Sequence, residues 1–177
     1  MRNTLLLILL FANNIYANEE LNRYLNDEKY KYSIVKDEIT NKIYIDLLYD
    51  KDILFIFTKN KENYKKTFNE KLYFCNDTSS SVFTGKGIYI ENNNLVISCG
   101  FSHNNSQSYY LDFHFDKNNI LQKIIEQDTN SNGVVIWKSI FTPKINPPTL
   151  KDFENIEFAD NYIIKNRKNF IYKLRND

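Results

Sequence analysis

The amino-acid sequence predicts a mainly β (α+β) fold: an antiparallel sheet or partly closed barrel, built from consecutive hairpins, with one or two short helices packed on it. Apolar and polar residues alternate over residues 109–116, the clearest period-two pattern in the chain. Short turns rich in Asn and Asp separate the apolar runs. Consecutive strands joined by short turns are typical of antiparallel sheets.

The first 17 residues have the layout of a secretory signal peptide. A charged start precedes an apolar run over residues 4–12, and Ala17 is a small residue at the expected cut. That run is about half of the ~20 residues that a membrane-spanning helix needs. We therefore expect cleavage after Ala17, the alternative being a buried N-terminal helix. Residues 18–177 would form a single globular domain, exported to the periplasm of a Gram-negative cell or otherwise secreted, with no stable membrane anchor.

The two cysteines, Cys75 and Cys99, both follow the expected cut. An even number of cysteines in an exported chain favours a disulfide, here between Cys75 and Cys99. The alternative is a pair of buried free thiols. Their separation is far from the Cys-x-x-Cys spacing of redox-active pairs.

The N-terminal part of the expected domain combines a helix with a hairpin. Residues 19–29 predict a short helix, because Leu21, Tyr24 and Leu25 share one helical face. Residues 43–49 and 53–57 alternate on either side of a polar turn and predict a hairpin. Residues 60–71 are polar, with Tyr64 and Phe68 four positions apart, and predict a second short helix or a solvated loop.

The remaining elements are mostly strands. A strand is expected to begin at residues 72–75, and Gly85–Gly87 marks a bend. The later strands are 88–91 with 95–101, 109–115 with 120–127, and 134–141. Prolines 143, 147 and 148 end this run, and Thr149 caps a short helix through Phe153. Residues 162–174 are a mixed apolar and basic strand or helix.

The strand over residues 109–116 carries a candidate site. Asp112, His114 and Asp116 share one face of it, and two carboxylates can orient an imidazole or help to bind a metal. We favour a simpler interpretation, in which these residues form the solvated face of an amphipathic strand. The chain has two histidines and no cluster of Cys and His, which excludes a three-histidine zinc site and a structural zinc module.

A calcium loop is a weaker candidate. Asp128, Asn130 and Asn132 match the opening of such a loop, and Gly133 follows them. The twelfth position is Ser139 where a bidentate Glu is needed, and the flanks are strands. A plain turn is therefore the favoured interpretation, and we expect neither a metal nor a cofactor.

The last part of the chain is basic and aromatic. Cations recur at Lys165, Arg167, Lys168, Lys173 and Arg175, among Phe170 and Tyr172. Such a segment is either a surface for an acidic partner or a soluble tail. We expect a partner-binding surface made of these five cations together with Tyr110, Asp112 and His114.

These observations favour recognition over catalysis. A formal net charge of +1 argues against nucleic-acid binding, and there is no G-x-S-x-G motif or phosphate-binding loop. We expect an exported protein-binding protein and not an enzyme: an inhibitor or immunity protein that neutralises a toxin or hydrolase by occluding its surface. The alternatives are a secreted hydrolase or small-ligand-binding protein using Asp112, His114 and Asp116, and a surface or adhesion module. An A/T-rich genome would by itself explain the abundance of Asn, Lys and Tyr.

Overall fold

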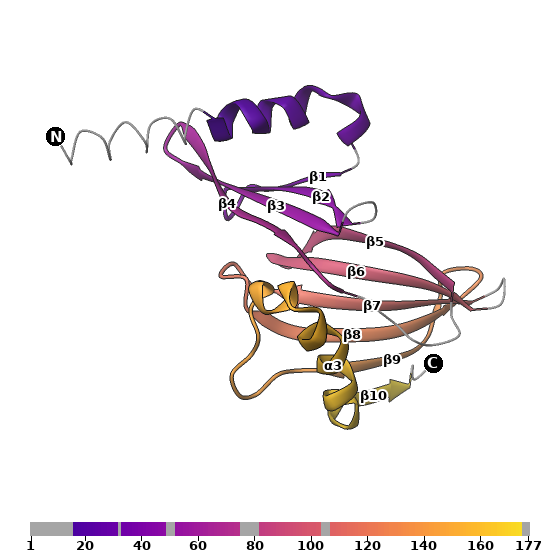
Figure 1. Cartoon of the computed structure of the whole chain (residues 1–177). Coiled ribbons are helices and arrows are strands. Elements are labelled where there is room, and N and C mark those ends of the chain that lie inside the picture. Colours follow the sequence, from indigo (N-terminus) through magenta and orange to yellow (C-terminus); the bar gives the residue numbers. More distant parts are fainter. Residues whose placement is uncertain (1–15, 32, 49–51, 75–81, 104–106, 175–177) are drawn as a thin grey trace. The chain divides into compact units, whose positions relative to one another are not determined.

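The structure, a computed structural model, describes residues 16–31, 33–48, 52–74, 82–103 and 107–174. It contains two open antiparallel sheets, of four and six strands, together with short helices (Figure 1). The predicted mainly β, antiparallel fold is confirmed. The chain divides into two compact units, one made of residues 1–47 and 53–70 and the other made of residues 48–52 and 71–177. The single domain expected over residues 18–177 stays a prediction, and each unit is described by itself.

Unit 1 consists of a helix on a four-stranded sheet in the order β1-β2-β3-β4. Its elements are the helix over residues 16–26, the 3-10 turn η1 (Glu28–Tyr30), and the strands β1 (Ile34–Asp37), β2 (Lys42–Leu47), β3 (Ile53–Asn60) and β4 (Asn63–Lys71). The helix and the β2–β3 hairpin agree with the sequence prediction. Strand β1 was not predicted from the sequence.

The core of unit 1 lies between the helix and the sheet. Leu21 and Tyr24 pack with Ile45 and Phe55, whereas Leu25, expected on the same helical face, is exposed. Ala17 also belongs to this core. The other residues of the predicted signal peptide, apart from Tyr16, lie outside the described residues, and cleavage after Ala17 stays a prediction.

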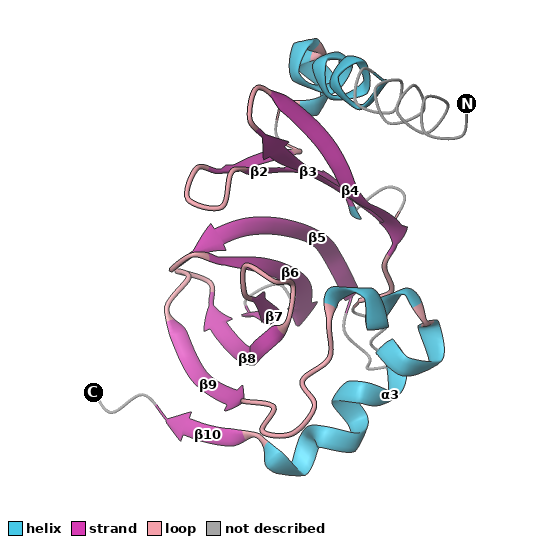
Figure 2. Ribbon diagram, turned by 90° about the vertical axis from the view of Figure 1, so that its left-hand side faces the viewer, coloured by secondary structure: helices cyan, strands magenta, loops and turns pink. Residues whose placement is uncertain are grey.

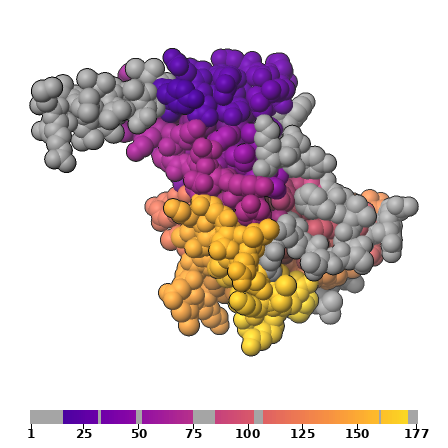
Figure 3. Space-filling model, in the orientation of Figure 1, coloured from indigo at the N-terminus to yellow at the C-terminus, as the bar shows by residue number. Residues whose placement is uncertain are grey.

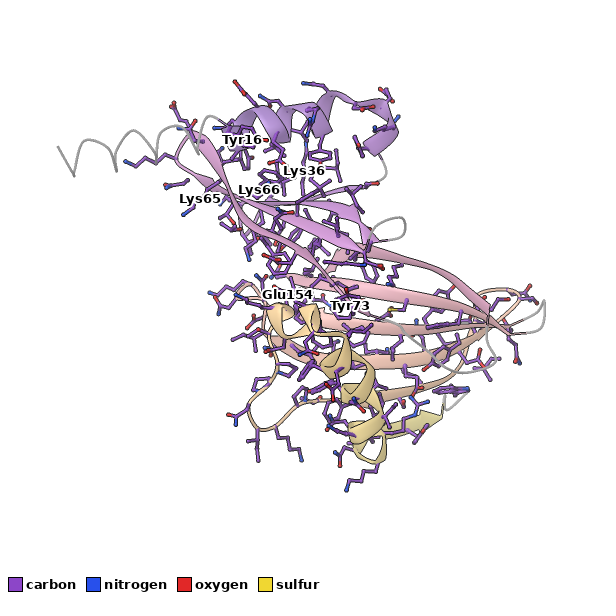
Figure 4. All side chains as sticks on the ribbon, viewed as in Figure 1. Tyr16, Lys36, Lys65, Lys66, Tyr73 and Glu154 are labelled. Atoms are coloured by element: carbon purple, nitrogen blue, oxygen red, sulfur yellow. The ribbon has the colours of Figure 1, made fainter. Side chains whose placement is uncertain are left out.

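The helix or loop predicted over residues 60–71 is wrong, because β4 occupies residues 63–71. Tyr64, Lys66 and Phe68 alternate with more exposed neighbours, as period two requires. Lys66 lies between the helix and the sheet (Figure 4). Its ammonium is 2.6 Å from a carboxylate oxygen of Glu20 and 5.3 Å from the centre of the Phe55 ring.

Unit 2 is a six-stranded sheet in the order β10-β9-β8-β7-β6-β5, with helical segments on one side (Figure 2). Its strands are β5 (Val82–Glu91), β6 (Asn94–His103), β7 (Gln107–Phe115), β8 (Leu121–Asn130), β9 (Val135–Phe141) and β10 (Ile171–Leu174). The helical segments between β9 and β10 are η2 (Leu150–Glu154), α3 (Ile156–Asn166) and η3 (Arg167–Asn169). The ambiguous segment 162–174 is thus the end of α3, then η3 and β10. The strand predicted at 72–75 is wrong for residues 72–74, which pair with no strand, and Cys75 lies outside the described residues.

Aromatic side chains hold the helical segments of unit 2 to one face of its sheet. Phe74 stacks on Phe153 of η2 with ring centres 4.5 Å apart, and its ring centre is 4.8 Å from that of Phe113 on β7. As predicted, Thr149 caps η2: its hydroxyl and backbone N–H both donate to the Asp152 carboxylate. This packing places α3 beside β9 and leads the chain back to the sheet as β10.

Asparagines make the turn between β5 and β6. Asn92 and Asn93 have φ values of 49° and 63°, the left-handed conformation that two-residue hairpin turns need and that Asn tolerates. Across the described ranges, we find no helix with the length and apolar character needed to cross a bilayer.

Candidate functional site

Strand β7 is buried on both of its faces in the half that carries the predicted site. Asp112 and His114 are 5% and 1% exposed, so the expected solvated face is wrong. Their neighbours explain this burial: Val96 of β6 lies opposite His114, Ile125 of β8 lies opposite Asp112, and both are buried. The sequence suggested that a partner contacts Asp112 and His114, but neither residue lies on the surface.

Asp116 does not join the other two residues. It follows the end of β7, and its carboxylate accepts the backbone N–H groups of Asn118 and Ile120 at 2.8 and 2.9 Å. These bonds hold the turn between β7 and β8. Asp116 is thus structurally separate from Asp112 and His114, which share one face of β7.

Asp112 is the acceptor of a small hydrogen-bond network across three strands. Ser98 of β6 donates its hydroxyl to one carboxylate oxygen at 2.5 Å, and Tyr89 of β5 donates to the other at 3.4 Å. Burial raises the pKa of Asp112, and the two hydrogen bonds counteract this rise. Burial and the nearby Asp112 carboxylate also raise the pKa of Tyr89. The two hydrogen bonds offset part of the cost of burying this carboxylate in the sheet.

His114 is neutral at physiological pH. Burial, followed by the positive charges of Lys123 and Lys138, lowers its pKa to about 4. Within the described residues neither ring nitrogen makes a hydrogen bond, and Nδ1 is 3.6 Å from a carboxylate oxygen of Glu91. A substrate cannot reach this imidazole unless the side chains around it move, so the geometry disfavours general acid–base catalysis here.

A second buried carboxylate, which the sequence analysis missed, lies on the opposite face of the sheet. Glu126 of β8 is fully buried and accepts hydrogen bonds from Tyr109 of β7 and, at 2.9 Å, from Ser139 of β9. Arg167 forms an ion pair with the same carboxylate. The available signal was strand parity, because Glu126 shares its face with Ile124, which is buried.

The ion pair changes the interpretation of Arg167. The sequence suggested that Arg167 contacts a partner, but its guanidinium is engaged with Glu126, although 48% of the side chain is exposed. Lys165 and Lys168, on either side of it, are exposed. The side chain of Lys173 and all of Arg175 lie outside the described residues. Tyr110 is half-buried on β7.

Exposed apolar side chains gather where the chain returns to the sheet. A groove of about 670 Å³ lies between the end of β9, the 142–146 loop, the end of α3 and the start of β10. Its apolar lining comprises Ile140, Phe141, Pro143, Ile145, Tyr162 and Ile171. Ile145 is 84% exposed and Ile171 67%. The space-filling view shows α3 and the segment after it on the surface of unit 2, in orange to yellow (Figure 3).

A second, shallower hollow lies beside η2. It has about the same volume, 680 Å³, and is lined by residues such as Tyr73 and Glu154, both labelled in Figure 4. The Asp152 carboxylate in its lining already serves the cap of η2.

The Asp128–Gly133 segment covers the end of β8 and the turn that follows it. The side-chain oxygen of Asn130 accepts the backbone N–H groups of Asn132 and Val134 at 3.0 and 2.9 Å, and Gly133 has a φ of 73°. Asp128 lies within β8, paired with Trp137. Searching only the described ranges, we find no group of three His, Cys, Asp or Glu residues placed to hold a metal ion.

Cys99 is fully buried on β6. Its expected disulfide partner, Cys75, lies outside the described residues. The Cys75–Cys99 disulfide therefore stays a prediction.

No protein-family model, curated protein or solved structure matches this chain.

Proposed function

We propose that this is an exported protein-binding protein, an inhibitor or immunity protein that neutralises a toxin or hydrolase by occluding its surface. The observation that carries the proposal is the groove beside β10, with its exposed apolar residues Ile145 and Ile171. We call this groove, together with the exposed side chains of residues 164–172, the C-terminal surface.

Exposed apolar residues next to cations are suited to recognition. Soluble monomers rarely expose large contiguous apolar patches, and burying one isoleucine side chain contributes about 1.5–3 kcal/mol. Ile164 and Tyr172, at 67% and 63%, are also strongly exposed, and Lys165 and Lys168 lie between them in the chain. An apolar centre with a polar rim is the usual anatomy of a protein interface.

The alternative of a secreted hydrolase or small-ligand-binding protein has less support. It requires access to Asp112, His114 and Asp116, yet the first two are buried and the third holds a turn. A surface or adhesion module would use the same exposed residues. Identifying the partner would distinguish such a module from an inhibitor.

The test is partner capture followed by substitution in the full chain. The protein, expressed with its own leader, is used to capture partners from the exported fraction with the products of adjacent genes supplied. One stoichiometric partner, whose activity the protein inhibits, is the expected result. Ile171→Asp should weaken that complex at least about tenfold, since a desolvated charge replaces an apolar contact.

Ile39→Asp is the matched control. Ile39 is 70% exposed, as Ile171 is, but it lies in the turn between β1 and β2 of unit 1. Thermal unfolding checks that both variants remain folded. Recovery of no partner, or equal weakening by the two substitutions, would contradict the proposal.

A further inference from the structure

Strand β10 forms one edge of the six-stranded sheet. In the described sheet it pairs with β9 on one side and has no strand on the other. Alternate backbone N–H and C=O groups of an edge strand point away from the sheet, where another chain can pair with them. Ile171 and Tyr172, which start this strand, are among the most exposed apolar residues of unit 2.

The opposite edge, β5, is less suited to pairing. Its register shifts between Phe83 and Gly85, and such a bulge interrupts the row of hydrogen-bonding groups. In addition, Lys86 of β5 forms an ion pair of 2.5 Å with Asp52. Of the two edges of this sheet, β10 is therefore the more open.

The groove next to β10 suits the side chains of an added strand. Successive side chains of a strand point to opposite faces, so every second one can enter the same hollow. Ile171 belongs both to β10 and to the lining of the groove. A strand paired with β10 would thus place an apolar side chain against Ile171 and its neighbours in the groove.

The charges near β10 indicate which kind of strand could pair with it. Between Asn161 and Leu174 the chain has four cations and no carboxylate side chain. Glu126 neutralises one of them, Arg167, and among the described side chains Lys165 and Lys168 are exposed. A second copy of β10 would bring like charges together, whereas an acidic strand would meet opposite ones.

From these four observations we infer that the exposed edge of β10 binds an extended acidic segment of the partner protein as an additional strand. Apolar residues of that segment would fill the groove, and its carboxylates would pair with the lysines around β10. The biological role of this edge rests on the proposed function, since it specifies how the partner is held.

Two synthetic peptides of equal length test the chemistry with the full chain. One alternates Glu and Val, and the other alternates Lys and Val. The acidic peptide should bind, more weakly as salt rises, and should slow hydrogen exchange of β10 amides. The basic peptide should bind at least about tenfold more weakly. Equal binding of the two peptides, or binding that leaves β10 exchange unchanged, would overturn the inference.

Substitutions in the chain locate the binding. Lys165→Glu with Lys168→Glu should weaken binding of the acidic peptide at least about tenfold. The matched control, Lys59→Glu with Lys61→Glu, makes the same charge change on exposed residues of unit 1 and should leave binding unaltered. Equal weakening by the two double variants would leave only a general charge effect and refute the inferred site.

Proline substitution separates backbone pairing from side-chain contact. Of two consecutive residues in an edge strand, one directs its N–H toward the sheet and the other away from it. Of Ile171→Pro and Tyr172→Pro, one should therefore lower the melting temperature, and the other should keep it but lose the acidic peptide. Full peptide binding by the variant that keeps its melting temperature would refute strand addition.

The two proposals can fail separately. If a captured protein partner binds the stable proline variant as tightly as the wild type, the edge inference fails and the proposed function stands. If the acidic peptide binds at β10 but no protein partner is captured, the proposed function fails and the edge remains a binding site for acidic strands.

Discussion

Arg167→Ala should destabilise unit 2 by removing the cation that pairs with a fully buried carboxylate. Removing one member of a buried ion pair costs about 3–5 kcal/mol, because the remaining charge stays desolvated. The Arg167 side chain is half-exposed, so solvent screens part of the interaction, and Tyr109 and Ser139 still donate to Glu126. We therefore expect a loss of about 2–3 kcal/mol in the free energy of unfolding.

Urea denaturation and thermal unfolding measure this loss. At about 2–4 °C per kcal/mol for a chain of this size, the melting temperature should fall by roughly 4–12 °C. Lys168→Ala, the neighbouring exposed cation, is the control and should change stability by no more than about 0.5 kcal/mol. In a Glu126→Gln background, Arg167→Ala should cost less than about 1 kcal/mol, because no buried charge is left unpaired.

Measurement of partner binding tests whether Arg167 also contacts the partner. The captured partner should bind folded Arg167→Ala nearly as tightly as the wild type, whereas Lys165→Glu with Lys168→Glu should weaken the complex. If Arg167→Ala leaves stability unchanged and abolishes the complex, the ion pair has no structural role. Arg167 then belongs to the contact surface, as the sequence alone suggested.

Three further predictions concern His114, the candidate calcium loop and Thr149. The folded state holds His114 neutral, with a pKa near 4. Below about pH 6.5 the unfolded chain therefore protonates this histidine more readily than the folded chain does. The free energy of unfolding should fall as the pH drops from about 6.5 toward 4. The raised pKa of Asp112 changes stability in the opposite direction, so the wild type is compared with His114→Gln. In that variant the loss of stability on acidification should be smaller. An identical dependence of stability on pH in the two proteins would refute the argument from burial. Added calcium should leave the melting temperature unchanged, because Asn130 already serves its turn, and a rise of several degrees would restore the calcium interpretation. Thr149→Ala should cost about 1 kcal/mol in urea denaturation through loss of the cap of η2, and a neutral result would show that Asp152 holds the turn alone.

The hairpins could be predicted from the sequence because their signals are local. Alternating side chains and short Asn-rich turns indicate β6 to β9 and the end of β5 without knowledge of their neighbours. The bend predicted at Gly85–Gly87 is wrong, because these residues lie within β5 and pair with β6. Residues 60–71 were predicted wrongly because Tyr64 and Phe68, four positions apart, fit both the helical period and the period of a strand. Only the position of β4 beside β3 decides between the two.

The candidate site was harder to predict because burial depends on tertiary structure. Alternation correctly placed Asp112 and His114 on one face of β7, but it could not show that Val96 and Ile125 flank them. The pairing of Arg167 with Glu126 joins two segments that are distant in the sequence. A cation in a basic run is usually solvated, so the run itself gave no sign of this pair.

Folded proteins usually bury apolar groups and expose polar ones, so a buried polar group or an exposed apolar patch calls for an explanation. In unit 2 most of the buried polar groups have a structural explanation: Glu126 and Asp112 each accept hydrogen bonds from neighbouring strands. The exposed Ile145 and Ile171 have no comparable explanation within the unit. Their exposure is unfavourable in water, and burial against another molecule would remove it. These observations support the proposal that the C-terminal surface serves recognition, whereas the two buried carboxylates are part of the hydrogen bonding within the sheet.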